Sequence, residues 1–234
     1  MKILIISSCT GKKRFGKNYP GQLSLADFQL GPAHVAAREA ALPAAVRVPA
    51  SDMYRGRQHT LTMQGISAAR AAGIGVDLWI LSAGYGLIPE HRVIVPYEAT
   101  FRGMGQGALN AWALALGVPA AFALLVHRHY DFGLVLLGAD YLRACDINFH
   151  TVFGGRTLLL GRPDAIAAPP PPHILRRQNV GPAEAGLVGE IVTAAKGEIA
   201  RRFLVELAPL NAAGRTSLVG QIMNPAIDPL NLIP

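Results

Sequence analysis

The sequence contains little cysteine and little charge. Only Cys9 and Cys145 occur among its 234 residues, too few for a disulfide framework or for a zinc site of four thiolates. Charged residues form 16% of the chain and hydrophobic residues 51%, so the composition excludes an intrinsically disordered protein. This length and apolar content predict one large domain, or one domain with an additional segment.

Long apolar runs and metal-binding motifs are also absent. The run at residues 3–6 is too short for a signal-peptide core or a membrane span. The longer apolar stretch at 111–126 is interrupted by Gly117 and Pro119, and it predicts a buried helix. No CxxC or HExxH pattern occurs, so we expect neither a metal site nor a cofactor. We expect a cytoplasmic protein with reduced thiols and no membrane partner.

Acidic residues are scarce relative to basic ones. The chain has 22 Lys and Arg against 15 Asp and Glu, which gives a formal net charge of +7. A surplus of this sign favours a partner that carries phosphates, because cations raise both affinity and encounter rate. The alternative interpretation is that arginine is abundant only because the whole composition is rich in Ala, Gly, Arg and Pro.

Apolar runs alternate with loops and helical segments through the first 160 residues. Three continuous apolar runs are typical of strands covered on both faces: residues 2–8, 76–82 and 132–137. A glycine pair between the short runs 149–153 and 156–160 predicts a hairpin. We therefore expect a three-layer α/β fold with an open, mostly parallel sheet.

The composition changes after residue 163. We expect an α/β domain at residues 1–163, followed by a proline-rich linker at 164–181. The linker contains four consecutive prolines, a stiff and extended sequence. Residues 182–234 follow as a helical appendage, with helical patterns at 183–207 and 212–223.

The loop after the first apolar run is basic. In open α/β sheets, ligands bind beyond the carboxyl ends of the strands. Small residues in this loop allow backbone N–H groups to face an anion, and cations supply charge. Thr10, Lys12, Lys13 and Arg14 are therefore candidate phosphate contacts. The loop lacks the Walker A pattern, and the alternative is a solvated basic loop.

The loop after the second apolar run carries aromatic rings. Two glycines flank Tyr85, so the chain can turn sharply and present this ring to a planar base. Ser82 is a candidate for hydrogen bonding to the base edge, and Tyr97 and Glu98 add a second ring and a carboxylate. The alternative is that both tyrosines pack against the core.

The segment ASDMYRGRQH at residues 50–59 carries a carboxylate and cations at a predicted helix start. Asp52 is the first candidate for a catalytic carboxylate, and Tyr54 is a further stacking candidate. Arg55 and Arg57 are candidate phosphate contacts. The alternative role of Asp52 is that of a helix N-cap.

Asp140 follows the third apolar run and is the second candidate carboxylate, with the same alternative of capping the helix that it precedes. Cys9 has no histidine at a telling spacing. We therefore expect a buried, unreactive thiol at Cys9 rather than a nucleophile.

Five short motifs occur in an order that resembles the peroxide-stress YaaA-like superfamily, and more closely its relatives of unassigned function. They are SSCTGKKR, ASDMYRGRQH, LSAGYGLIPEH, PYEATF and LLGADYLRA. The first motif is also similar to the S-C-x-x-K-P loop of the middle domain of archaeal tRNA-guanine transglycosylase and archaeosine synthase. The resemblance covers about residues 1–160.

The resemblance implies a pocket for a nucleobase or nucleic acid on a sheet like that of uracil-DNA glycosylases. It also implies a role in DNA modification or defence against phage. The uracil-glycosylase motifs GQDPY and HPSPLS are absent. The catalytic candidates therefore depend on the chemistry of the residues alone.

Together these features predict a DNA glycosylase-like enzyme that acts on a modified or extruded base. A carboxylate offsets the oxocarbenium charge and orients water, aromatic rings hold the base, and cations hold the DNA backbone. Two alternatives stay open: a non-enzymatic DNA-binding protein of the YaaA type, and an enzyme transferring ribosyl groups of nucleosides or nucleotides. We expect a nucleic-acid partner, DNA rather than RNA, and predict no particular protein partner.

Overall fold

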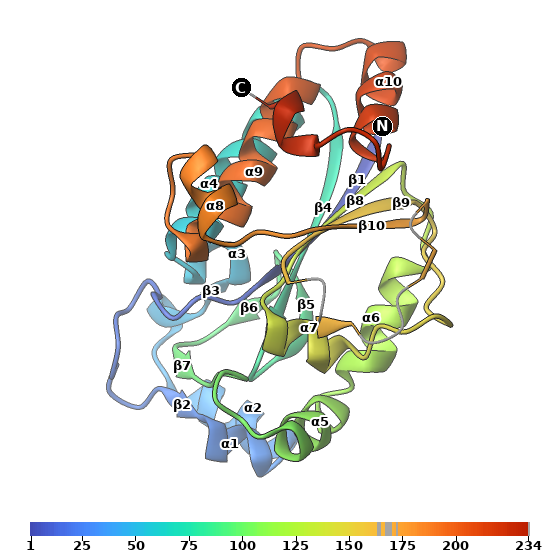
Figure 1. Ribbon diagram of the computed structural model, residues 1–234. Coiled ribbons are helices and arrows are strands. Elements are labelled where there is room, and N and C mark those ends of the chain that lie inside the picture. Colours follow the sequence, from blue (N-terminus) through green and yellow to red (C-terminus); the bar gives the residue numbers. More distant parts are fainter. Residues whose placement is uncertain (163–164, 167–169, 172, 234) are drawn as a thin grey trace.

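The computed structural model describes residues 1–162, 165–166, 170–171 and 173–233. Within these residues, six strands form a central sheet in the order β10-β9-β8-β1-β4-β5 (Figure 1). The strands are β1 (Lys2–Ser8), β4 (Gly75–Ser82), β5 (Gly86–Pro89), β8 (Phe132–Leu136), β9 (Arg156–Leu160) and β10 (Leu175–Gln178). All neighbours in the sheet are parallel except β4 and β5, which are antiparallel.

Strand β1 is the centre of the sheet. It pairs with β4 on one side and with β8 on the other, so Ile5 lies between Leu78 and Leu134. All three side chains are fully buried. Continuous apolar sequence is required here because helices cover both faces of the sheet.

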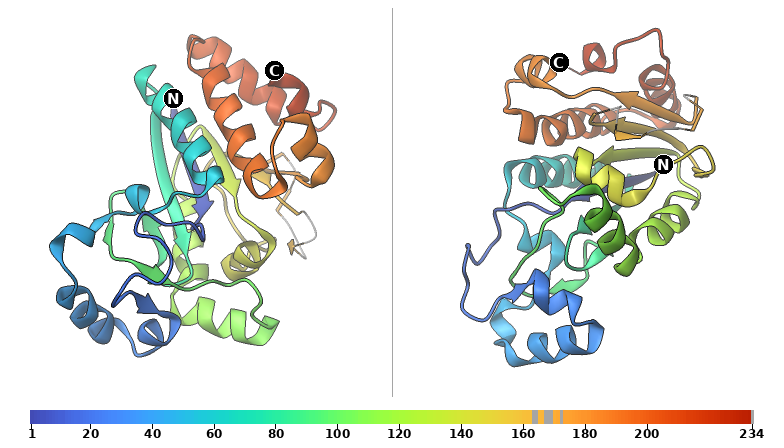
Figure 2. Two further views of the ribbon diagram at one scale, coloured as in Figure 1. Left: turned by 90° about the vertical axis from the view of Figure 1, so that its left-hand side faces the viewer. Right: turned by 60° about the horizontal axis from the view of Figure 1, so that its bottom comes forward.

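Helices lie on both sides of this sheet (Figures 1 and 2). The longer ones are α2 (Pro32–Ala41), α4 (Arg57–Ala71), α5 (Gln106–Ala115), α6 (Val118–Val126), α9 (Val192–Leu207) and α10 (Ala212–Ile222). The shorter ones are α1 (Leu25–Gln29), α3 (Ala50–Met53), α7 (Ala139–Cys145), α8 (Pro182–Leu187) and the 3₁₀ turns Ala44–Val46 and Pro229–Leu232. A mixed α/β fold with a mostly parallel central sheet and C-terminal helices is thus confirmed.

Two short strand pairs connect loops outside the central sheet. Strand β2 (Leu23–Ser24) pairs with β7 (Tyr97–Glu98), and β3 (Val48–Pro49) pairs with β6 (Val93–Ile94). These pairs hold the long loop after β4 against the first 50 residues.

No single helix in the described residues is both long and apolar enough to cross a membrane. Helices α5 and α6 reach that composition only as a pair, and the chain bends by 67° between them. Gly117, at the bend, has a positive φ of 66° that suits glycine.

Two predictions from the sequence are wrong: the hairpin at residues 149–160 and the part of the linker at residues 175–178. Residues 149–153 form no strand, because Gly154 and Gly155 serve a close backbone approach rather than a hairpin turn. A Cβ at Gly155 would lie 2.0 Å from the carbonyl oxygen of Tyr130. In the expected linker, residues 175–178 form strand β10, whose backbone pairs with β9. Residues 163–164, 167–169 and 172 of the proline-rich region lie outside the described residues.

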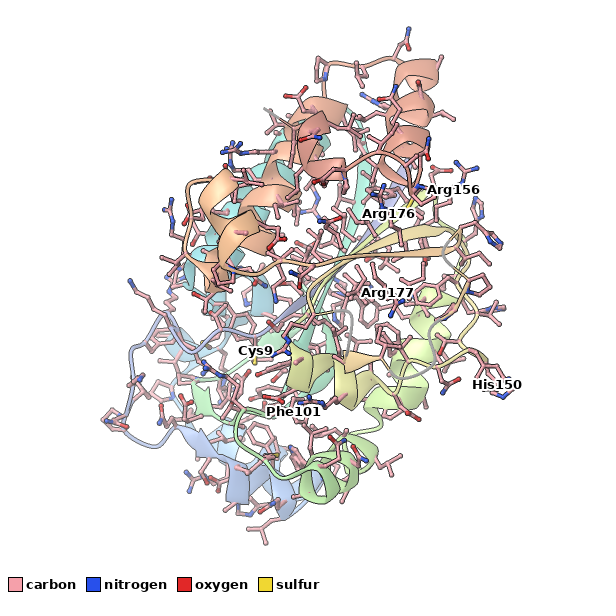
Figure 3. The ribbon with its side chains drawn as sticks, viewed as in Figure 1. Cys9, Phe101, His150, Arg156, Arg176 and Arg177 are labelled. Atoms are coloured by element: carbon pink, nitrogen blue, oxygen red, sulfur yellow. The ribbon has the colours of Figure 1, made fainter. Side chains whose placement is uncertain are left out.

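Arg176 explains why this strand is fixed in place. Its guanidinium donates to the backbone carbonyls of Ile222, Asn224 and Ile227 in the C-terminal segment, with 2.7 Å between Nη1 and the Asn224 oxygen (Figure 3). Strand β10 is therefore bound by its backbone to the sheet and by one side chain to the last helical segment.

Helix α9 packs side by side with α4, and two glycines allow the contact (Figure 2). A Cβ at Gly197 would lie 2.3 Å from the carbonyl oxygen of Gln58, and one at Gly65 would lie 2.7 Å from the Cα of Arg201. Position 58 thus meets 197 and position 65 meets 201, so the two helices run parallel. Both helices therefore begin at the same end of the sheet.

We expect Gly197→Ala to lower the free energy of unfolding by about 1–3 kcal/mol, because the added methyl group would force the helices apart. Gly186→Ala in α8 is the matched control, since its Cβ would meet no atom within 4 Å. That change should be neutral or stabilising by up to about 1 kcal/mol. Urea denaturation measures both, and equal effects would contradict the proposed contact.

Candidate functional site

A cavity of about 750 Å³ lies beyond the carboxyl ends of β1 and β8. The chain leaves β1 for β4 on one side of it and later returns to β8 on the other side, so this is the switch point of the sheet. Ligands of open α/β sheets bind at such points. The wall is made by residues 8–13, 56–58, 98–100 and 138–141, with Lys17, Arg102, Ile191, Thr193 and Lys196.

Two sequence motifs meet at one side of the cavity. The backbone N–H of Arg55 donates to the carbonyl of Lys12 at 2.9 Å, and that of Gly56 donates to Thr10 Oγ1 at 3.1 Å. A Cβ at Gly56 would lie 2.6 Å from the Cβ of Thr10, so glycine is needed for this approach. The basic loop and the segment 50–59 therefore form one surface.

Gln58 holds the switch point together. Its Nε2 donates to Ser7 Oγ at 3.2 Å and to the carbonyl oxygen of Leu136 at 3.1 Å, joining the ends of β1 and β8. The side chain is buried and lines the cavity. Sequence reasoning missed this residue, because a glutamine in a helical segment carries no chemical signal.

The charge of the lining is mainly positive. Its cations are Lys12, Lys13, Lys17, Arg57, Arg102 and Lys196, and its carboxylates are Glu98 and Asp140. Lys13 is buried and lies 3.4 Å from Glu98, with its ammonium 4.7 Å above the Tyr97 ring. Asp140 accepts from Arg143 at 2.8 Å within α7. Anions are favoured in such a cavity.

Arg57 connects the starts of the two parallel helices. Its Nε donates to both carboxylate oxygens of Glu190 at 2.8 and 2.9 Å, just before α9 begins. Glu190 is largely buried, and the hydrogen bond from Arg57 lowers its pKa. Arg57 thus has a structural partner in addition to its place on the cavity wall.

Three of the predicted base-binding residues form a buried hydroxyl chain. The hydroxyl of Tyr97 is hydrogen-bonded to that of Tyr54 at 2.8 Å and to Ser82 Oγ at 2.7 Å. Burial raises the pKa of both tyrosines, so the chain is neutral. All three side chains are buried and none lines the cavity, so the structure gives them no open surface for a base.

Tyr85 also lies outside the cavity lining. Its hydroxyl donates to Glu39 Oε1 at 2.8 Å, and its ring packs edge-on against Phe28 and Tyr97. The rings of Phe28 and Tyr97 therefore occupy the space beside Tyr85 where a base was expected to stack. None of the three tyrosines expected to bind a base lines the cavity; the tyrosine that does is Tyr141, which was not singled out from the sequence.

Asp52 does not lie where the sequence predicts it. It is exposed in the first turn of α3 and does not line the cavity. Helix α4 begins only at Arg57, with Gly56 as its N-cap, because Tyr54 forms a β-bridge with Lys13 between the two helices. Asp52 therefore caps neither helix. Arg14 and Arg55 are exposed outside the lining as well.

Cys9 is on the cavity wall rather than fully buried. Its Sγ lies 3.1 Å from the hydroxyl of Tyr141, whose ring packs edge-on against Phe101 (Figure 3). The thiol thus has a hydrogen-bond partner on the cavity wall. Cys145 is buried, and burial raises the pKa of its thiol.

Several cavity residues carried no usable signal in the sequence. Arg102, Thr193 and Lys196 are single polar residues, and the last two lie beyond the region of the recognised motifs. Their position depends on how α9 packs, which a local pattern does not encode. In the described parts of the chain, no three His, Cys, Asp or Glu side chains are arranged to hold a metal ion.

The chain is similar to a family of unknown function, DUF6884, over residues 41–147. This segment contributes 56–58, 98–100, Arg102 and 138–141 to the cavity wall. The remaining wall comes from the loop after β1 and from the start of α9. No curated protein matches the chain.

We expect Tyr97→Phe to lower the free energy of unfolding by about 1–3 kcal/mol, because buried Tyr54 and Ser82 each lose a partner. The control is Tyr19→Phe, since Tyr19 is half-buried and its hydroxyl bonds no other described residue. Thermal and chemical denaturation compare the two. A Tyr97→Phe protein as stable as the control would contradict the importance of the hydroxyl chain.

Proposed function

We propose that the protein cleaves the N-glycosidic bond of a nucleotide bound in the switch-point cavity, with a modified or extruded base of DNA as the substrate. The observation that carries this proposal is the combination of two carboxylates with a cationic wall in one cavity. A volume of about 750 Å³ lies in the usual range for small-molecule sites. The resemblance to the YaaA-like superfamily implies a pocket for a nucleobase or nucleic acid, which supports such a substrate.

The reaction needs a carboxylate beside the sugar. When the C1′–N bond breaks, positive charge develops on C1′ and the ring oxygen, and water then adds to C1′ while the base leaves with a proton. Asp140 is the carboxylate that we assign to stabilise this charge and to orient the water. Arg143 holds it at 2.8 Å. Asp52, which the sequence favours, lies outside the cavity lining.

Glu98 is the second carboxylate of the cavity. Its neighbour Tyr97 is fixed by the hydroxyl chain, and Lys13 lies 3.4 Å from its carboxylate. In this proposal Tyr97 and Lys13 are positioning residues, since they act by holding Glu98 rather than by touching a base. The base itself occupies the part of the cavity near Cys9 and Tyr141.

The exposed cations of the cavity lining attract the phosphates of a nucleic-acid backbone. Lys12 and Lys17 are exposed and line the cavity, where the backbone phosphates that flank an extruded nucleotide gain from their charge. We extend the proposal to a cytoplasmic role in DNA modification or phage defence, which the resemblance implies.

We expect Asp140→Asn to reduce single-turnover base release on the order of 100-fold while DNA binding is retained, since a neutral amide cannot offset the developing charge. The measurement is the formation of alkali-labile abasic sites in duplexes that carry a panel of modified bases. Asp52→Asn is the matched control and should release base at the wild-type rate.

The same assay separates the alternatives. DNA binding without abasic sites in the wild-type protein would favour the non-enzymatic YaaA-like function. Base release from free nucleotides alone would favour ribosyl transfer. Base release by Asp140→Asn at the wild-type rate would remove Asp140 from the mechanism.

We expect Lys12→Gln to weaken DNA binding to all sequences and to reduce the salt slope by about one unit, because one phosphate contact is lost. Lys2→Gln is the control, because Lys2 begins β1 at the amino end of the strand, opposite the end that faces the cavity. Fluorescence anisotropy at several salt concentrations measures both. An unchanged slope in Lys12→Gln would show that Lys12 does not contact the backbone.

A further inference from the structure

One wall of the cavity comes from the start of α9. Ile191, Thr193 and Lys196 line it, and all three lie beyond the segment that matches the family of unknown function. Helix α9 reaches the cavity because it runs parallel to α4, as the neighbouring ribbons show (Figures 1 and 2). No role described so far uses this wall.

Lys196 is a cation without a counter-ion. In the described part of the chain, no hydrogen bond or ion pair joins its ammonium to another residue. The nearest acids in sequence are engaged elsewhere: Glu190 binds Arg57, and Glu198 binds Arg201 and Arg202. Burial lowers the pKa of Lys196 to about 8. A positive charge is therefore held in the cavity at the cost of lost hydration.

The surrounding groups favour an anion at the same place. The charged groups that face the cavity from the other elements are Lys12, Lys13, Lys17, Arg57, Arg102, Glu98 and Asp140. Glu98 and Asp140 have cationic partners in Lys13 and Arg143, so they do not neutralise Lys196. The hydroxyl of Thr193 adds a neutral donor one helical turn before Lys196.

The helix starts add to this charge. Both α4 and α9 begin at the cavity, and neither N-cap residue, Gly56 or Ile191, provides a side-chain cap. Parallel helices place the positive ends of both dipoles together. This contribution supports the site that the cavity and Lys196 already define.

We propose that the corner formed by Lys196, Thr193 and the start of α9 binds the phosphate of the nucleotide substrate. This inference rests on the proposed function only in taking the ligand to be a nucleotide. The phosphate belongs either to a free nucleotide, as a monoester, or to a DNA strand, as a diester, and both present anionic oxygens to the same donors. Lys196 supplies the charge, and Thr193 supplies a directional hydrogen bond.

The test is calorimetric binding of inorganic phosphate and of the four common deoxynucleoside 5′-monophosphates, each compared with its nucleoside. We expect at least one nucleotide to bind tenfold or more tightly than its nucleoside. Lys196→Met should remove that difference, and Lys196→Arg should keep most of it. Lys2→Met, which removes an exposed lysine at the amino end of β1 and outside the cavity lining, should change the affinity less than threefold.

The pH dependence provides an independent readout. A phosphate monoester is fully ionised above pH 7, since its second pKa is near 6. A bound phosphate raises the pKa of Lys196, so affinity is full below the pKa of the free lysine, about 8, and falls as the pH rises above it. We expect a fall of about fivefold between pH 8 and 9 in the wild-type protein and none in Lys196→Met.

Thr193→Val is a second variant. It should lose less affinity than Lys196→Met, and the loss should be independent of pH because the threonine hydroxyl does not titrate. If no phosphate compound binds better than its nucleoside, or if Lys196→Met and wild type bind nucleotides equally, the phosphate site is wrong. A folded Lys196→Met protein is verified by its thermal melting. An oligonucleotide without terminal phosphates distinguishes the two sources: binding lost in Lys196→Met assigns the site to a DNA strand.

The two proposals can fail separately. If phosphate binding depends on Lys196 but no substrate releases its base, the phosphate site is supported and the proposed glycosidic cleavage is wrong. If base release depends on Asp140 but substitution of Lys196 leaves phosphate binding unchanged, only the phosphate site is wrong.

Discussion

The close parallel contact between α4 and α9 is the constraint on which the rest of the structure depends. It requires glycine at 65 and 197, because any Cβ there would overlap the backbone of the facing helix. Once the helices lie this close, their starts coincide at the carboxyl ends of β1 and β8. The same contact therefore covers one face of the sheet and builds one wall of the cavity.

Charge around the cavity is arranged so that acids are paired and some bases are not. Glu98, Asp140 and Glu190 each have a cation within ion-pairing distance. Among the described cavity residues, Lys12, Lys17, Arg102 and Lys196 have no such carboxylate partner. Lys12, Lys17 and Arg102 are exposed and keep their hydration, whereas Lys196 is partly buried. Removing water from this unpaired charge is unfavourable, so Lys196 costs stability that an anionic ligand would return.

The sheet was largely predictable from the sequence, and the site only partly. Strands β1, β4 and β8 follow from continuous apolar runs, and their ends locate the cavity. Strand β10 was missed, because its stretch Leu-Arg-Arg-Gln has a single apolar residue and pairs through its backbone. Asp52 was misplaced, because the helix predicted after it is broken by the bridge between Lys13 and Tyr54. The glycines of the helix contact could not be recognised, since their partners lie more than 100 positions away.

The central position of β1 has a consequence for the segment shared with the family of unknown function. That segment, residues 41–147, includes β4 and β8 but begins after β1. The two strands are hydrogen-bonded to β1 and not to each other. Residues 41–147 alone would leave a strand-wide gap with two unpaired edges, which are prone to aggregation. In this chain the shared segment therefore depends on β1, a strand that it does not contain, for the centre of its sheet.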